Sequence, residues 1–74
     1  MLSIEVRVNR DLIGHAYIKN TQTERRNKIV YEVTYYKPSK EEIMKFEVLH
    51  KPDEGVEKLI FLVYGEVVKR LDEA

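Results

Sequence analysis

Apolar and polar residues alternate along the first part of the chain, which predicts antiparallel strands. Ile4, Val6 and Val8 alternate with polar neighbours, the period-two pattern of a strand with one buried face. Residues 9–11, Asn-Arg-Asp, predict a tight turn, because Asn and Asp bond to their own backbone and tolerate sharp bends. The alternation resumes over residues 12–20, so the first two strands are expected to form a hairpin.

The second strand contains Gly14, and a glycine inside a strand predicts a bulge or a close backbone approach. By alternation, Leu12, Ala16 and Ile18 are assigned to the buried face and Ile13 to the open face. The entirely polar residues 20–28 are then expected to form a mobile hairpin tip.

Two more strands are predicted after this tip. Residues 29–37 are rich in β-branched and aromatic side chains, which favour strands. Pro38 ends this strand because proline fixes its own φ and lacks an amide donor. Residues 44–51 predict a fourth strand. Ser39 followed three residues later by Glu42 is a capping-box pattern, which leaves a single helical turn at residues 39–44 open as an alternative.

The C-terminal stretch can be interpreted as a strand or as a helix. Residues 59–64 alone fit a buried strand, whereas over residues 56–71 the apolar side chains recur at steps of three and four. The recurring positions are Val56, Leu59, Ile60, Val63, Tyr64, Val67, Val68 and Leu71. A strand leaves the last three unexplained. Gly65 opposes a helix at a cost of about 1 kcal/mol. Because the helix accounts for all of these positions, it is the prediction, and the strand is the alternative.

These elements predict one α+β domain over residues 1–74. Its architecture is a small two-layer sandwich, in which an antiparallel β-meander (β-β-β-β) packs one face against a single C-terminal α-helix. A chain this short buries only about 60% of the surface that its unfolded form exposes, so its stability margin is thin. One face of the sheet is expected to remain uncovered.

Composition and charge narrow the classes of function. Thirteen basic and thirteen acidic residues give a formal net charge of zero, which removes the usual argument for nucleic-acid binding. The chain has no cysteine, which excludes disulfides and thiolate metal sites. No segment resembles a signal peptide or a bilayer-spanning run. We therefore expect a cytoplasmic protein without a cofactor and without a membrane partner.

Catalytic patterns are not evident in the sequence. The only histidines, His15 and His50, fall on different predicted strands without metal-ligand spacing. Ser3 and Ser39 lie outside any nucleophile elbow. The glycines are scattered, so no phosphate-binding loop is formed. We therefore expect no enzymatic activity and no small-molecule substrate.

Apolar residues on surfaces that the fold leaves open favour an interaction module. On the open sheet face these are Ile13, Tyr17, Val30, Tyr36 and Leu49. On the helix, Phe61 flanks the apolar stripe and Leu62 points roughly opposite it. The predicted contact residues are Tyr17, Tyr36, Phe61 and Leu62, and the predicted partner is another protein or a second copy in a homodimer. The competing interpretation is ordinary exposed apolar surface.

Nucleic-acid binding is the alternative function. Arg25, Arg26 and Lys28 cluster at the predicted hairpin tip, from which they could reach phosphates. Arg7 and Lys19, with the sheet tyrosines, could form a basic and aromatic face on which bases stack. Glutamates on the same face oppose this hypothesis, and a solvated loop is the simpler interpretation of the tip.

Overall fold

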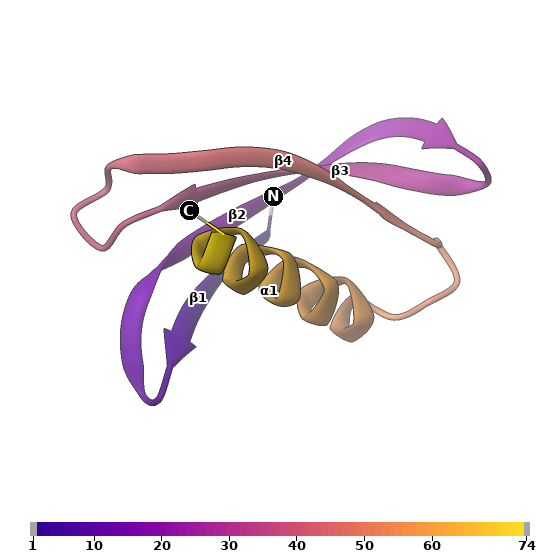
Figure 1. The fold of residues 1–74 in the computed structure, drawn as a ribbon. Helices are drawn as coiled ribbons and strands as arrows, with labels where there is room; N and C mark the ends of the chain where they lie inside the picture. Colours follow the sequence, from indigo (N-terminus) through magenta and orange to yellow (C-terminus); the bar gives the residue numbers. More distant parts are fainter. Residues whose placement is uncertain (1, 74) are drawn as a thin grey trace.

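The computed structural model describes residues 2–73, which form a four-stranded antiparallel sheet and one helix (Figure 1). The strands are β1 (Leu2–Val8), β2 (Asp11–Arg25), β3 (Lys28–Tyr36) and β4 (Glu42–His50), and the helix is α1 (Val56–Glu73). The strands neighbour one another in chain order, so the sheet is a meander. The predicted α+β architecture is confirmed, and so is the helix over the C-terminal stretch.

The core lies between α1 and one face of the sheet. On α1, Val63 and Val67 are fully buried and Leu59 is nearly so. The buried sheet residues that complete the cluster are Val6, Ala16, Ile18, Val33, Tyr35, Phe46 and Val48. Successive strand residues point to opposite faces, so burying this set leaves the other face of the sheet open.

Side chains near both edges of the sheet hold α1 in place. The guanidinium of Arg70 lies 4.5 Å from the ring centroid of Phe46 in β4. The Tyr64 hydroxyl donates a hydrogen bond to the carbonyl oxygen of Arg7 in β1. Because β1 and β4 are the two edge strands, these contacts fix the direction in which α1 crosses the sheet.

Gly14 lies at an irregularity in the pairing of β1 with β2. Val6 pairs with Gly14, but the next β1 residue, Arg7, pairs with Leu12, which makes Ile13 the extra residue of a β-bulge. This confirms the feature predicted at Gly14. The assignment of Ile13 to the open face was wrong, since Ile13 packs against the core. A bulge shifts the alternation by one residue, which a regular period-two pattern does not reveal.

Two hairpins close with pairs of residues in the left-handed backbone region. Asn9 and Arg10 have φ of 53° and 72°, and Arg26 and Asn27 have φ of 56° and 63°. Such pairs are typical of type I′ turns, whose twist matches that of the flanking strands. The turn predicted after β1 is confirmed. The loop expected over residues 20–28 is wrong, because backbone pairing continues through polar residues and leaves only a two-residue turn.

Polar side chains also organise a bulge inside β2. Thr21 and Gln22 are the extra residues where the register between β2 and β3 shifts. The Thr21 hydroxyl donates to the Val30 carbonyl oxygen at 2.7 Å, and Asn20 Oδ1 accepts from the Gln22 amide at 2.7 Å. Val30 is only 2% exposed beside this bulge, so it was wrongly expected to add apolar surface to the open face.

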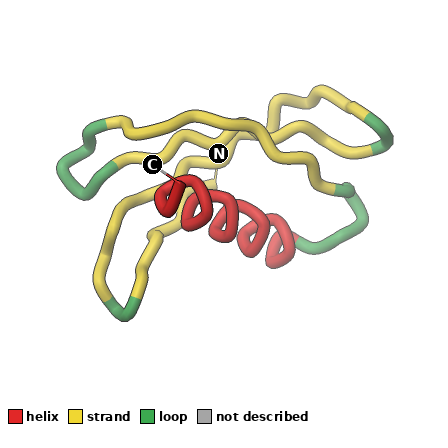
Figure 2. Tube along the Cα trace, viewed as in Figure 1, coloured by secondary structure: helices red, strands yellow, loops and turns green. Residues whose placement is uncertain are grey.

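The connection between β3 and β4 is a hairpin loop. The Lys37 amide donates to the Glu41 carbonyl oxygen at 2.9 Å, and the Lys40 amide donates to the Lys37 carbonyl oxygen at 2.8 Å. β4 begins at Glu42, so the helical turn considered at residues 39–44 does not form. Figure 2 shows this loop and the loop that leads into α1 in green.

The start of α1 is braced by two side chains. The Nε2 atom of His50 lies 2.9 Å from the Glu54 carbonyl oxygen, and Lys58 Nζ lies 3.0 Å from Glu54 Oε2. The hydrogen bond from Lys58 lowers the pKa of the Glu54 carboxyl below its ordinary value. The loop before α1 is thus connected both to the end of β4 and to the first turns of the helix.

Gly14 is expected to tolerate no side chain. A Cβ atom there would clash with the Tyr35 hydroxyl oxygen and with the Tyr36 carbonyl oxygen. The Gly14→Ala substitution should therefore lower the free energy of unfolding by about 2 kcal/mol or more, measured by urea denaturation. Gly65→Ala is the matched control, because its Cβ would meet open space. Because position 65 lies inside α1, Gly65→Ala should raise the free energy of unfolding by about 1 kcal/mol. Equal effects at the two glycines would contradict this account.

The ion pair at the start of α1 predicts a pH effect with a definite sign. The folded-state pKa of Glu54 lies below its unfolded value, so the pair stabilises the fold above the unfolded pKa. This contribution is lost as the pH falls through the folded pKa. Lys58→Met should move the pKa of Glu54 back toward 4.5, measured by NMR titration of the carboxyl carbon. Lys69→Met should leave it unchanged, and an unshifted Glu54 in the Lys58 variant would disprove the contact.

Candidate functional site

The open face of the sheet carries a pair of tyrosines beside a cavity. The ring centroids of Tyr17 in β2 and Tyr36 in β3 are 5.3 Å apart, and the ring planes meet at 83°, an edge-to-face contact. Tyr17 is 38% exposed. An open cavity of about 550 Å³ is lined by His15, Tyr17, Thr34, Tyr36, Lys37, Pro38 and Lys40. We call these seven residues the tyrosine groove.

The register of the strands builds the tyrosine groove. His15 pairs with Tyr36, and Tyr17 pairs with Thr34, so the four side chains occupy adjacent positions on one face of two neighbouring strands. The loop after β3 closes one end of the groove with Pro38 and two lysines. The two tyrosines were predicted from the sequence pattern, whereas the loop residues were not, although Pro38 and its lysine neighbours follow Tyr36 almost directly in the chain.

The rim of the tyrosine groove is basic. Lys37 and Lys40 line it, and no carboxylate is among the lining residues in the described part of the chain. Lys37 Nζ lies 3.5 Å from Glu41 Oε2, but both side chains are more than half exposed. Such a surface ion pair contributes little energy, and a ligand can replace it. The groove therefore suits a ligand that combines an aromatic or aliphatic group with negative charge.

An acidic row separates the tyrosine groove from the hairpin tip between β2 and β3. Lys19 pairs with Glu32, and Glu32 pairs with Glu47, which forms a row across β2, β3 and β4. Arg25 at the tip lies beyond this row, with its guanidinium 3.8 Å from Glu47 Oε1. The tip and the loop after β3 lie at opposite ends of the sheet (Figure 1). The structure does not bring the tip cations and the tyrosines together.

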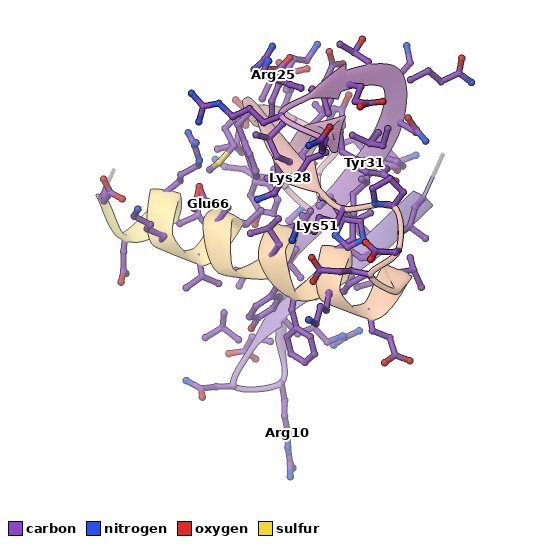
Figure 3. All side chains as sticks on the ribbon, turned by 90° about the vertical axis from the view of Figure 1, so that its right-hand side faces the viewer. Arg10, Arg25, Lys28, Tyr31, Lys51 and Glu66 are labelled. Carbon is purple, nitrogen blue, oxygen red and sulfur yellow. The ribbon has the colours of Figure 1, made fainter. Side chains whose placement is uncertain are left out.

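The other basic residues of the nucleic-acid hypothesis are dispersed as well. Arg26 is exposed in the tip turn, and Lys28 is half-buried at the first position of β3. Arg7 lies near the turn between β1 and β2, with its guanidinium 3.3 Å from Glu5 Oε2. Figure 3 shows Arg25 and Arg10, which mark the two hairpin tips, on opposite sides of α1. The five predicted cations do not form one surface.

The outer face of α1 exposes two apolar side chains. Phe61 is 77% exposed, the highest value for a large apolar residue among residues 2–73. Leu62 is 39% exposed and, together with Phe61 and Leu49, lines a second cavity of about 230 Å³. Both side chains are exposed as expected, but Phe61, which was expected only to flank the apolar stripe, is the more exposed of the two. At 3.6 residues per turn, Phe61 lies about 160° around the helix from Val63 and points outward more directly.

The remaining polar groups of the interior take part in the fold. Among residues 2–73, no three His, Asp or Glu side chains converge as a metal site requires. His50 is buried, with its ring centroid 6.0 Å from that of Tyr31. The Tyr35 hydroxyl donates to the Ile13 carbonyl oxygen, and burial raises the pKa of that hydroxyl.

Among residues 2–73, the one helix is not long and apolar enough to cross a bilayer.

The contact between Tyr17 and Tyr36 can be measured directly. Alanine substitutions at both positions, singly and together, form a double-mutant cycle for the free energy of unfolding. An edge-to-face pair should give a coupling energy of about 0.5–1.5 kcal/mol. A cycle between Tyr17 and Tyr31 serves as the control, because Tyr31 packs against the core on the other sheet face. Coupling of equal size in both cycles would exclude a specific ring contact.

We compared the chain with models of protein families, with curated proteins and with solved structures, and none of them matches. The function proposed below is therefore derived from the residues of this chain alone, chiefly the tyrosine groove and its basic rim.

Proposed function

We propose that this protein is a small non-enzymatic interaction module. Its tyrosine groove binds a protein partner that presents acidic side chains around an aromatic or aliphatic anchor. The single observation that carries this proposal is the coincidence of two tyrosine rings, an open cavity and two lysines on the sheet face that α1 leaves uncovered.

The tyrosines supply the binding energy in this proposal. Aromatic side chains are enriched among the few residues that dominate protein interfaces. Tyr17 and Tyr36 are held by the sheet and by each other, so little conformational freedom remains to be lost when a partner binds. The groove volume of about 550 Å³ is sufficient for one or two side chains of a partner.

The lysines supply selectivity. Lys37 and Lys40 give the groove a positive rim, which attracts acidic segments and repels basic ones. A partner carboxylate near Lys37 competes with Glu41, whose ion pair with this lysine is exposed to solvent. The expected partner segment is therefore acidic as well as apolar.

Nucleic-acid binding remains the alternative prediction, and the arrangement of charges favours it less. A strand of nucleic acid that reached from the hairpin tip to the tyrosines would cross Glu32 and Glu47. Negative charge on that path repels phosphates and offsets the attraction of Lys19 in the row and of Lys45, which pairs with Thr34 on the same face.

Selection from a displayed library of short random peptides tests the proposal. Peptides enriched on the wild-type protein should combine acidic residues with an aromatic or aliphatic residue. Their amide chemical-shift changes should map to the groove. Tyr36→Ala should weaken the binding of an enriched peptide by about tenfold or more, measured by fluorescence polarisation. Lys40→Glu should weaken it too, whereas Lys51→Glu, an exposed lysine outside the groove, should not.

Two results would overturn the proposal. One is a set of enriched peptides without acidic residues. The other is equal binding to the wild-type protein and to Tyr36→Ala. Gel retardation of single-stranded RNA or DNA that the Arg25→Ala/Arg26→Ala variant loses would support the alternative instead. In that case the slope of log affinity against log salt should be about −0.7 to −0.9 per phosphate contacted.

A further inference from the structure

The outer face of α1 carries a row of exposed residues that takes no part in the core. Its members are Glu57, Phe61, Gly65 and Lys69, spaced by four positions along the helix. Residues with this spacing form a continuous ridge on a helix surface. The row therefore presents, in order, an acid, a protruding ring, a gap without a side chain, and a base. We call it the α1 row.

Two members of the α1 row do not stabilise the fold of a single chain. Phe61 leaves 77% of its surface in water. Gly65 is a poor helix former, and a Cβ atom there would meet open space, so nothing within this chain requires a glycine. A protruding ring and a gap one turn apart are, however, complementary shapes. They fit one another when two such helices meet in opposite directions.

We infer that α1 pairs with α1 of a second copy, antiparallel, about a two-fold axis that crosses the outer face of α1 at the height of residue 63, opposite the buried Val63 side chain. Residues 61 and 65 lie two positions on either side of Val63, so this axis places Phe61 of each copy over Gly65 of the other. Residues 57 and 69 lie six positions on either side, so the same axis places Glu57 of each copy against Lys69 of the other. One symmetry operation thus matches both shape and charge along the whole row.

The packing geometry of helices agrees with this arrangement. Helices that meet through rows spaced by four cross at about −50°, the commonest class in globular proteins. Crossed helices diverge away from the contact, so the acidic residues near the helix ends, Glu54 and Asp72, are not forced together. A parallel pair is disfavoured, because it would place Phe61 on Phe61 and Glu57 beside Glu57.

The inferred dimer uses the opposite layer of the molecule from the tyrosine groove. Pairing through α1 turns both open sheet faces outward and leaves both grooves accessible. The inference therefore stands independently of the function proposed for the groove. A single helix pair buries less surface than the roughly 1,200 Å² of a standard stable interface, so the dimer should be weak, with Kd on the order of 10⁻⁵ to 10⁻⁴ M.

Sedimentation equilibrium tests the inference on the full chain, at protein concentrations from ~10 μM to ~1 mM, across the expected Kd. The wild-type protein should shift from monomer to dimer. Phe61→Ala should raise Kd by about tenfold or more. Gly65→Gln should do the same by filling the gap, and its unfolding temperature should not fall, since glutamine is a better helix former. Val56→Ala, at an exposed apolar position of α1 outside the row, is the matched control.

Charge reversal tests the direction of the pairing. Glu57→Lys and Lys69→Glu should each raise Kd by about fivefold or more, because each places like charges together twice in its homodimer. An equimolar mixture of these two variants should recover the wild-type Kd, since every facing pair in the heterodimer is then opposite in sign.

A wild-type protein that stays monomeric at ~1 mM would overturn the inference. So would a dimer indifferent to Phe61→Ala and Gly65→Gln, or a mixture that fails to recover. The Tyr36→Ala variant should dimerise normally, which separates this result from any result on the groove.

Discussion

The burial of Leu59, Val63 and Val67 against one face of the sheet is the interaction on which the rest of the structure depends. A single sheet without a second layer would leave its apolar face in water, and a chain of 74 residues has little stability in reserve. The helix therefore decides which face is core and which is open. The tyrosine groove is a consequence of that choice, because the side chains that alternate with the core residues necessarily point to the uncovered face.

Much of the fold could be predicted from periodicity, because burial imposes it. The helix was identified from steps of three and four that continue to Leu71, and the strands from alternation around residues such as Val6 and Val33. The errors occurred where side-chain burial does not control the backbone. Asn20 and residues 23–25 remain paired although they are polar, because the strand ladder needs only backbone groups. Ile13 faces the core because a bulge shifts the alternation by one position.

The candidate site was less accessible to sequence reasoning. Tyr17 and Tyr36 were found because aromatic residues on a polar face depart from the expected pattern. Their contact depends on the register between β2 and β3, which is set by the turn at Arg26 and Asn27 together with the bulge at Thr21 and Gln22. The contribution of Lys40 depends on the hairpin loop after β3, which competed with a helical turn in the sequence pattern. Position along a strand is readable from spacing, whereas neighbours across strands are not.

The meander topology has a kinetic consequence. Each strand pairs only with the next in the chain, so forming the sheet requires closure of short loops alone. The docking of α1 is different: the hydrogen bond from Tyr64 to Arg7 joins positions 57 residues apart. Chains dominated by local contacts fold quickly. Hairpin formation should therefore precede the docking of α1. During synthesis, the apolar face of the sheet would stay exposed to water until α1 has been made.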